Sequence, residues 1–249
     1  MPEDAVLHIT HIIRRMATGV TEPFLCECDD GNKYVIKGKP RLSRKELMAE
    51  WISAKLAQFL ELSIPQFLLV YVDNDVIAFA SPEWKRDLQE GHAFACSYIE
   101  QSIPISFYQA HTNIDTQTRK FIYLFDKWIN NADRTLAKNG LGNVNLLFNV
   151  INNRYYLIDH NLSFYHDYAQ EEFRSHVYCP SQRDWTYDLV DLQDFRDRLN
   201  GALLAFGAML STIPEDWKLD DDASQIEFVE FLRSTLERAV HEDFWSTLE

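Results

Sequence analysis

The sequence predicts an α+β protein in two unlike parts, a β-rich N-terminal part with one prominent helix and an α-rich C-terminal part. Short apolar runs separated by turn residues dominate up to about residue 100, whereas apolar residues recur at helical spacing beyond it. The pattern changes near 100–104, which predicts domains at 1–102 and 103–249. A chain of 249 residues that is 46% hydrophobic is long enough for two lobes that share a cleft.

The N-terminal elements follow from local patterns. In FLCECDDGNKYVIKG, two extended runs flank Asp29–Asn32, which predicts a β-hairpin. SRKELMAEWISAKLAQFLEL has helical spacing, and Ser43 with Glu46 forms a capping-box pattern, so a helix begins there. QFLLVYVDNDVIAFA predicts two strands around 73–75, and HAFACSYIE predicts one more.

The C-terminal elements start with RKFIYLFDKWINN, whose apolar spacing predicts an amphipathic helix. NLLFNVI and RYYLID then predict a hairpin with a first strand over 145–151 and a turn at Asn152 and Asn153. This register sets Asp159 opposite about Leu146. Beyond Tyr168 the pattern is mostly helical.

Composition narrows the function classes. A formal net charge of −14 disfavours direct binding to a nucleic-acid backbone. The sequence contains no run of roughly 18 apolar residues, so no membrane span is expected. Its first residues lack the basic segment followed by an apolar segment that is typical of a signal peptide. Of the four cysteines, Cys26 and Cys28 form a close pair, but no second close pair exists, so a zinc site is not expected. This use of cysteine fits a reducing cytoplasm.

Oxygen-bearing side chains gather around the second hairpin. Asn143 and Asn145 lie at the same end as Asp159, and Asp133 lies in the loop that leads to that end. Carboxylate and amide oxygens suit a hard cation such as Mg²⁺. The alternative is structural, because Asn and Asp are also residues of turns and helix caps.

The N-terminal part supplies complementary groups. Lys37 ends an apolar strand and Glu50 lies mid-helix, so an ion pair could hold the ammonium against phosphate oxygens; the alternative is two solvated surface charges. The loop at 17–24 contains Gly19 before a strand, as in loops that bind phosphate through main-chain N–H groups, although one glycine is typical of a simple turn.

Taken in order, these features resemble the HipA-like kinases, a bacterial branch of the protein-kinase-like superfamily that is also similar to lipid kinases. The order is a glycine-containing loop, a strand lysine, a helix glutamate, then Asp-Arg-Thr, Asn-Val-Asn-Leu-Leu and Leu-Ile-Asp-His. The resemblance spans roughly 18–164 and is strongest over 126–164. It implies a two-lobed protein-kinase-like fold.

The resemblance also implies a role for each matching residue. Asp133 would be the catalytic aspartate, and Asn143 and Asp159 would hold Mg²⁺. ATP would be bound by the phosphate loop, the Lys–Glu pair and a hinge within 94–99. The implied nucleotide-binding residues are Thr18, Gly19, Lys37, Glu50, Ala95, Cys96, Ser97 and Tyr98. The same resemblance implies autophosphorylation of Thr18 or Thr21.

One departure concerns the catalytic loop. Asp133 and Asn143 are ten positions apart, whereas about five is usual in kinase catalytic loops. Asn139 and Asn145 therefore remain alternative ligands, and Asn143 is preferred because its register leads straight into the strand. His160 is expected to pack or support, Asp126 to brace the loop, and Trp51 and Trp128 to lie in the core.

The function implied is transfer of the γ-phosphate of ATP to a Ser or Thr hydroxyl of a protein substrate, with a possible toxin role and an antitoxin partner. A kinase acting on a lipid or a small molecule would use the same residues. A non-catalytic pseudokinase is the alternative from another class, and the long catalytic loop favours it.

Overall fold

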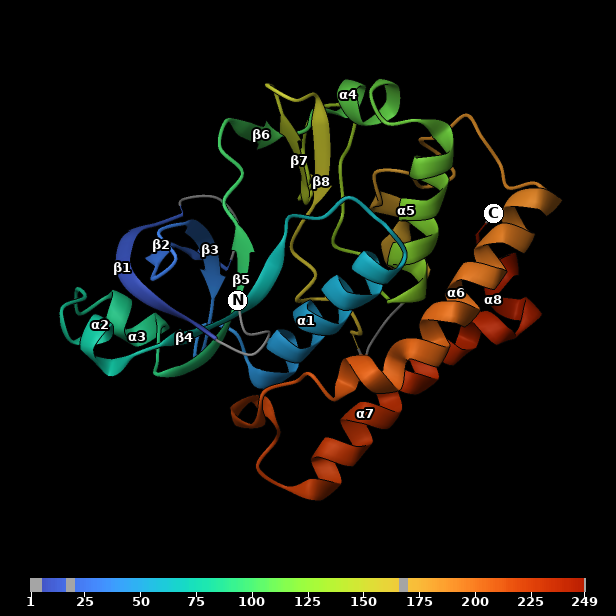
Figure 1. Cartoon of the computed structure of the whole chain (residues 1–249). Coiled ribbons are helices and arrows are strands. Elements are labelled where there is room, and N and C mark those ends of the chain that lie inside the picture. The colour runs from blue at the N-terminus through green and yellow to red at the C-terminus, as the bar shows by residue number, and fades with distance from the viewer. Residues whose placement is uncertain (1–5, 17–20, 166–169, 249) are drawn as a thin grey trace.

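The computed structural model describes residues 6–16, 21–165 and 170–248. Its N-terminal part is a closed five-stranded barrel in the order β1-β2-β3-β5-β4 (Figure 1). The strands are β1 (Leu7–Arg15), β2 (Phe24–Cys28), β3 (Lys33–Lys37), β4 (Phe67–Val72) and β5 (Gly91–Ser97). The predicted β2–β3 hairpin and the predicted strand at β5 are confirmed.

Helix α1 (Arg44–Phe59) lies between β3 and β4 in sequence and begins where the sequence predicts. The Ser43 side chain accepts a hydrogen bond from the Glu46 N–H, and the Glu46 carboxylate accepts one from the Ser43 N–H, so the capping box is complete. This start directs Glu50 and Trp51 into the protein, where both are buried. The cap therefore sets which face of α1 meets the rest of the molecule.

The second strand predicted after 73–75 is wrong. Helices α2 (Asn74–Ala78) and α3 (Trp84–Asp87) occupy this segment. Asp73 has extended backbone at the N-cap of α2, and its carboxylate accepts from His8 on β1. Val76 and Ile77 then pack on the barrel core from a helical turn. The two apolar residues are adjacent, and a short helix lets both pack against the barrel, where an alternating strand would point them to opposite faces.

The C-terminal part begins with a three-stranded sheet in the order β6-β7-β8 and with helices α4 and α5. The elements are β6 (Ser102–Pro104), α4 (Phe107–Thr112), α5 (Thr116–Trp128), β7 (Leu146–Asn149) and β8 (Arg154–Leu157). The predicted helix is present at α5, and the predicted hairpin is present at β7–β8.

The hairpin register differs from the prediction by two residues. Leu146 pairs with Leu157, not with Asp159, which lies beyond the strand end. The Asn149 side chain accepts from the N–H groups of Ile151 and Asn152 and so closes a longer turn over 150–153. An asparagine at the start of a turn commonly makes such bonds, and here they move the register.

Helices complete the C-terminal part, as predicted. They are the 3-10 helix η1 (Gln170–Ser175), α6 (Leu189–Leu210), η2 (Glu215–Trp217), α7 (Asp222–Glu237), η3 (Arg238–Val240) and α8 (Glu242–Ser246). Figure 1 shows α6 running beside α1 on the side away from the barrel, with α8 next to it and the α6–α7 connection reaching toward the barrel.

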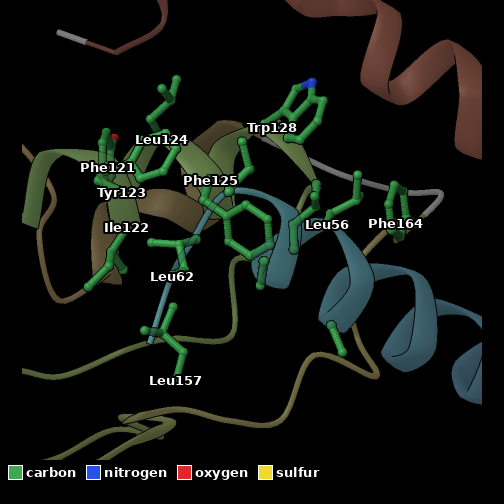
Figure 2. Packing of buried hydrophobic residues seen from close by; sticks show 14 of the residues in the cluster. Leu56, Leu62, Phe121, Ile122, Tyr123, Leu124, Phe125, Trp128, Leu157 and Phe164 are labelled. Carbon is green, nitrogen blue, oxygen red and sulfur yellow. The ribbon is translucent and has the colours of Figure 1, made fainter. Parts of the chain in front are cut away.

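Two hydrophobic cores fill the protein. One lies inside the barrel and includes Cys26 and Cys28, which are free and buried. The other joins α1 to the C-terminal helices and holds Trp51 and Trp128, as predicted. Figure 2 shows Leu56 of α1 against α5 in this second core. Helix α1 thus belongs by packing to the C-terminal part.

No helix among the described residues is long and apolar enough to cross a membrane.

Candidate active site

A cleft of about 490 Å³ is lined by residues of the barrel, of α1 and of the β7–β8 hairpin. Its walls are largely apolar, with Val35, Phe67 and Phe94 on one side and Leu146 on the other. Lys37, Glu50, Asn143, Asn145 and Asp159 line its polar end. An apolar cleft with a few convergent polar groups is the usual form of a ligand site.

Lys37 lies at the centre of the polar end. Its Nζ donates to Glu50 Oε2 at 2.8 Å and to Asp159 Oδ1 at 2.6 Å. Lys37 and Glu50 are only 7% and 3% exposed, which excludes the alternative of two solvated surface charges. The strand β3 ends at Lys37, and the capped start of α1 turns Glu50 toward it.

The charges in this trio shift one another. Burial opposes ionisation of Asp159, but the Lys37 ammonium outweighs it and lowers the pKa of that carboxyl. Burial raises the pKa of Glu50, and Lys37 opposes the rise. Burial also disfavours the Lys37 ammonium, yet its two carboxylate partners raise its pKa overall. Lys37 is therefore charged at neutral pH.

Asp159 and Glu50 are held by the main chain as well. Glu50 Oε2 accepts a hydrogen bond from the His160 N–H at 3.0 Å, which ties α1 to the residue after Asp159. Asp159 has φ +61°, a left-handed conformation that aspartate tolerates better than most residues. Such backbone conformations persist where surrounding bonds hold them, often at functional sites.

Asp133 lies next to this trio and receives two amide donors on one oxygen. Asn143 Nδ2 donates to Asp133 Oδ2 at 2.6 Å, and Asn145 Nδ2 donates to the same atom at 2.9 Å. The other carboxylate oxygen, Oδ1, makes no hydrogen bond within the part of the chain that the structure describes. Burial raises the pKa of Asp133, Asn145 opposes this, and the nearby Asp159 charge adds to it.

The long catalytic loop still brings Asp133 and Asn143 together. The Thr135 N–H donates to the Asn143 carbonyl, and the Asn143 N–H donates to Thr135 Oγ1, both at 2.9 Å. The residues between them form an exposed turn in which Asn139 Oδ1 accepts from the Leu141 N–H. Asn139 is thus removed from the site, whereas Asn143 and Asn145 both belong to it.

A buried polar cluster lies beneath the catalytic loop, and we call it the hub: Asp126, Arg134, His160 and His176. The Asp126 carboxylate accepts from Arg134 at 2.7 Å, from His176 Nε2 at 2.9 Å and from Asn131 at 2.8 Å. Arg134 also contacts His160 Nε2 at 3.0 Å and the carbonyl of Asn145. Asp126 braces the loop, and His160 supports it, as predicted.

Two hub members were not anticipated from the sequence. Arg134 was expected only as part of a motif, and His176 follows a stretch with no recognisable pattern. His176 reaches the hub because the Val177 N–H donates to the Arg134 carbonyl, which aligns 176–177 with the catalytic loop. A buried histidine without a helical or strand pattern around it carries no sequence signal that could have revealed this contact.

Part of the predicted hinge, residues 94–99, lines the cleft, and part of it is used by the barrel for packing and hydrogen bonding. Cys96, Ser97, Tyr98 and Ile99 line the cleft, whereas Ala95 lies in the barrel core. The N–H groups of Ser97 and Tyr98 donate to the carbonyls of Gln66 and Lys33. A main-chain N–H donor for a bound base therefore has to come from beyond Tyr98.

The phosphate loop is described only at its ends. Thr18 and Gly19 lie outside the described residues, so their predicted contacts are untested. Thr21 lines the cleft, and the Met16 N–H donates to the Pro23 carbonyl across the base of the loop.

The donor set fits a magnesium-bound nucleotide. Among the described residues, no cluster of three or more His, Cys, Asp or Glu side chains could hold a metal by itself. However, Mg²⁺ in nucleotide sites uses one or two protein ligands together with phosphates and waters. Asp159 offers a carboxylate, and Asn143 offers Oδ1, because its Nδ2 is used by Asp133.

Comparison with known proteins agrees with this geometry. The model of a family described as HipA-like kinase matches residues 9–248. The structure of a Helicobacter pylori proinflammatory kinase, CtkA, is similar over 98% of this chain and 97% of its own, with a TM-score of 0.60 and 12% identity. The structure of the Golgi casein kinase with Mn/ADP bound is similar over 98% of this chain and 73% of its own, with a TM-score of 0.51 and 12% identity. No curated protein matches the sequence. At these identities the two likenesses show a shared, kinase-like fold.

Proposed function

Because this chain belongs to the HipA-like kinase family, we propose that it transfers the γ-phosphate of ATP to a Ser or Thr hydroxyl of a protein, with Mg²⁺ as cofactor. One observation carries the proposal. Lys37, Glu50, Asp159 and Asn143 converge at the polar end of a single apolar cleft, and Asp133 lies just behind them, hydrogen-bonded to Asn143. The residues come from segments up to 122 positions apart in sequence, so their meeting is a property of the fold.

The nucleotide would lie with its base between the apolar walls and its phosphates at Lys37. Glu50 would keep the Lys37 ammonium in place, so that the charge is fixed before the phosphates arrive. Asp159 and Asn143 would hold the cation, which supplies charge neutralisation on the phosphate oxygens. The Mn/ADP bound to the Golgi casein kinase supports a nucleotide and a divalent cation in this fold.

Asp133 would act on the acceptor. Its Oδ1 would accept the proton of the substrate hydroxyl while the hydroxyl oxygen attacks the γ-phosphorus. The bond from phosphorus to the β–γ bridging oxygen breaks, and ADP leaves with that electron pair. The two amide donors on Oδ2 orient the carboxylate for this contact, and most of the rate enhancement would come from positioning and charge neutralisation.

We propose further that residues 1–102 and 103–249 act as two lobes around the cleft. Helix α1 qualifies this division, since it packs with the C-terminal core. A protein substrate, an antitoxin partner, a toxin role, autophosphorylation at Thr18 or Thr21 and a cytoplasmic location remain predictions.

The test is phosphate transfer by the purified chain with γ-labelled ATP and Mg²⁺, alone and with a bacterial extract. Asp133→Ala is the matched negative, and Glu242→Gln, which changes a surface ion pair between α6 and α8, is the positive control. Protein label that is lost only in Asp133→Ala supports the proposal, and phosphoamino-acid analysis identifies Ser or Thr.

Two other outcomes would change the proposed function. ATP consumed without labelled protein indicates a lipid or small-molecule acceptor, which the same residues could serve. No ATP consumption by either the wild type or Glu242→Gln, together with retained binding of a fluorescent ATP analogue, contradicts the kinase proposal and favours the pseudokinase.

A further inference from the structure

The Lys37–Glu50 pair joins two separately packed bodies. Lys37 is on β3, whose interior side chains fill the barrel core. Glu50 is on α1, which packs in the core of the C-terminal part. The distance between their charged atoms therefore depends on how the barrel is docked against α1, and not on either core alone.

Aromatic contacts supply one part of this docking. Trp51, next to Glu50, meets Phe67 of β4 and Phe94 of β5 edge to face, with ring centroids 5.3 and 6.4 Å apart. Aromatic pairs favour this arrangement over a range of centroid distances of about 4.5–7 Å, so these contacts do not fix the position by themselves.

A second part comes from the α6–α7 connection, at Thr212–Trp217, which we call the strap. The Asp216 carboxylate accepts from Lys39 Nζ at 3.0 Å, and from the His92 N–H at 3.0 Å and Nδ1 at 2.8 Å. Trp217 is fully buried and donates through Nε1 to the His92 carbonyl at 2.9 Å. The strap thus grips the barrel at two points, just beyond β3 and at the start of β5.

The strap also grips α1. Trp51 Nε1 donates to Thr212 Oγ1 at 2.8 Å, and the Trp51 and Trp217 rings meet edge to face at 6.5 Å. Figure 1 shows the connection passing below α1 at the end nearer the barrel. One short segment therefore holds the neighbours of both charged partners, since Lys39 is two residues from Lys37 and Trp51 is adjacent to Glu50.

Gly91 shows that this contact needs space at the barrel. It has φ +125°, and a Cβ built there would lie 2.5 Å from Asp216 Oδ2 and 3.3 Å from Lys39 Nζ. Only glycine adopts this backbone freely and admits the carboxylate at this distance.

We propose that the strap is a positioning element of the active site, which sets the Lys37–Glu50 contact by clamping the barrel to α1 through Asp216, Trp217 and Thr212. The role of Lys37 in catalysis rests on the proposed kinase function, whereas the clamping itself does not. Hydrogen bonds to charged groups are directional, so they supply the position that the aromatic packing leaves open.

The test reads the position of Lys37 without using catalysis. An amine-reactive reagent labels lysines at a rate that depends on exposure, and peptide mass spectrometry reports each site. Lys33 is exposed on the same strand and serves as internal reference. In Asp216→Ala, which leaves the Lys39 ammonium and both His92 donors without their acceptor, we expect Lys37 to label about tenfold faster relative to Lys33.

Graded variants separate positioning from loss of fold. Asp216→Asn keeps an acceptor oxygen and should restore labelling most of the way to the wild-type rate. Thr212→Val keeps the shape and removes the hydroxyl that accepts from Trp51 and donates to the Met209 carbonyl within the same turn, so it provides the second variant if Asp216→Ala does not fold. Glu242→Gln should label like the wild type.

The outcome of the labelling stands apart from the kinase test. Faster Lys37 labelling in Asp216→Ala or Thr212→Val, in protein whose circular dichroism is unchanged, supports the strap even if the wild type transfers no phosphate. If the wild type does transfer phosphate, kcat should fall with the same ranking of variants. Labelling of Lys37 within about twofold of wild type in both folded variants overturns the proposal.

Discussion

The hub and the edge of the cleft each contain a buried or half-buried aspartate, but the two carboxylates have opposite surroundings. Asp126 lies in the hub, and Asp133, seven positions later, lies at the edge of the cleft, where Asn143 and Asn145 of the cleft lining donate to it. Burial disfavours the charge of both carboxylates. In the hub, Arg134 and His176 outweigh burial and lower the pKa of Asp126. At the edge of the cleft, the two amide donors do not outweigh burial, and the pKa of Asp133 is raised.

The difference indicates which carboxylate is structural and which is available for chemistry. Asp126 is fully buried and accepts four hydrogen bonds, so its contribution is to hold the loop. Asp133 has one oxygen engaged by two amide donors, and no side chain or main chain of the described residues hydrogen-bonds to its Oδ1. A group with a shifted pKa and unused hydrogen-bonding capacity next to a cleft is a typical candidate for acid–base work.

The Asp133→Asn variant gives the strongest test of the difference between Asp133 and Asp126. We expect phosphate transfer to fall by about 10²–10⁴-fold, the usual contribution of a positioned general base. The free energy of unfolding at neutral pH should stay the same or rise, because the ionised Asp133 carboxylate is disfavoured in the folded state. Steady-state kinetics and urea unfolding of one preparation measure both. A clear loss of stability would show that Asp133 is structural as well.

The opposite pattern is expected in the hub. Arg134→Met keeps most of the side-chain volume but leaves the buried Asp126 carboxylate without its cation, which typically costs about 3–5 kcal/mol. Urea unfolding would measure this loss. Adding Asp126→Asn to the same chain should recover part of it, since no charge is then left unpaired. A loss below about 1 kcal/mol for Arg134→Met would contradict a structural hub.

The sequence predicted the groups with a local signature better than those without one. The capping box at Ser43 and the spacing of α1 placed Glu50 correctly, because a helix repeats at short range. The order of motifs placed Asp133, Asn143 and Asp159 at one end of the hairpin. Their role in catalysis stays a prediction, although the geometry fits it.

Features that depend on distant contacts were missed. The segment at α2 was predicted as a strand, but Val76 and Ile77 pack on the barrel from a helix that contacts β1, which is remote in sequence. The hairpin register was shifted by the side-chain bonds of Asn149. His176 reaches Asp126 across 50 positions. In each case tertiary contacts overrode the local pattern.

A smaller effect should appear as a pH dependence of stability. His176 is fully buried, and this burial is the main reason why its pKa is lowered. The Arg134 charge lowers the pKa further, and Asp126 opposes the shift without reversing it. Below about pH 6.5 the unfolded chain takes up a proton on this histidine that the folded chain does not, so stability falls as pH falls. The loss is at most about 1.4 kcal/mol per pH unit for each such group. His160, whose pKa is lowered to about 3 by burial and by Arg134, adds in the same direction.

Unfolding free energies at several pH values between 7.5 and 5.5 would show this slope. His176→Gln cannot take up the proton and should flatten it. An unchanged slope in that variant would assign the pH dependence to other groups.

The smallest effect is expected from the exposed turn within the catalytic loop, and it decides whether the ten-residue spacing matters. The turn is self-contained, since Ala137 donates to the Leu141 carbonyl and Gly140 donates to the Ala137 carbonyl. Replacing 137–141 by a single glycine should change unfolding free energy by less than about 1 kcal/mol, because loop closure depends weakly on length. Phosphate transfer should stay within about threefold of wild type, since Thr135 and Asn143 still hold the two ends together.

Gly142 is the matched contrast at the end of the same turn. It has φ +133°, and a Cβ there would lie 2.5 Å from the Thr135 carbonyl oxygen. One added methyl in Gly142→Ala should therefore disturb the Thr135–Asn143 contact, and with it the two amide donors on Asp133, more than removal of the whole turn does. Comparing the two variants by kcat separates loop length from loop anchoring. If shortening lowers kcat more than Gly142→Ala, the turn itself contributes to the active site, and the long spacing is a functional feature of this chain.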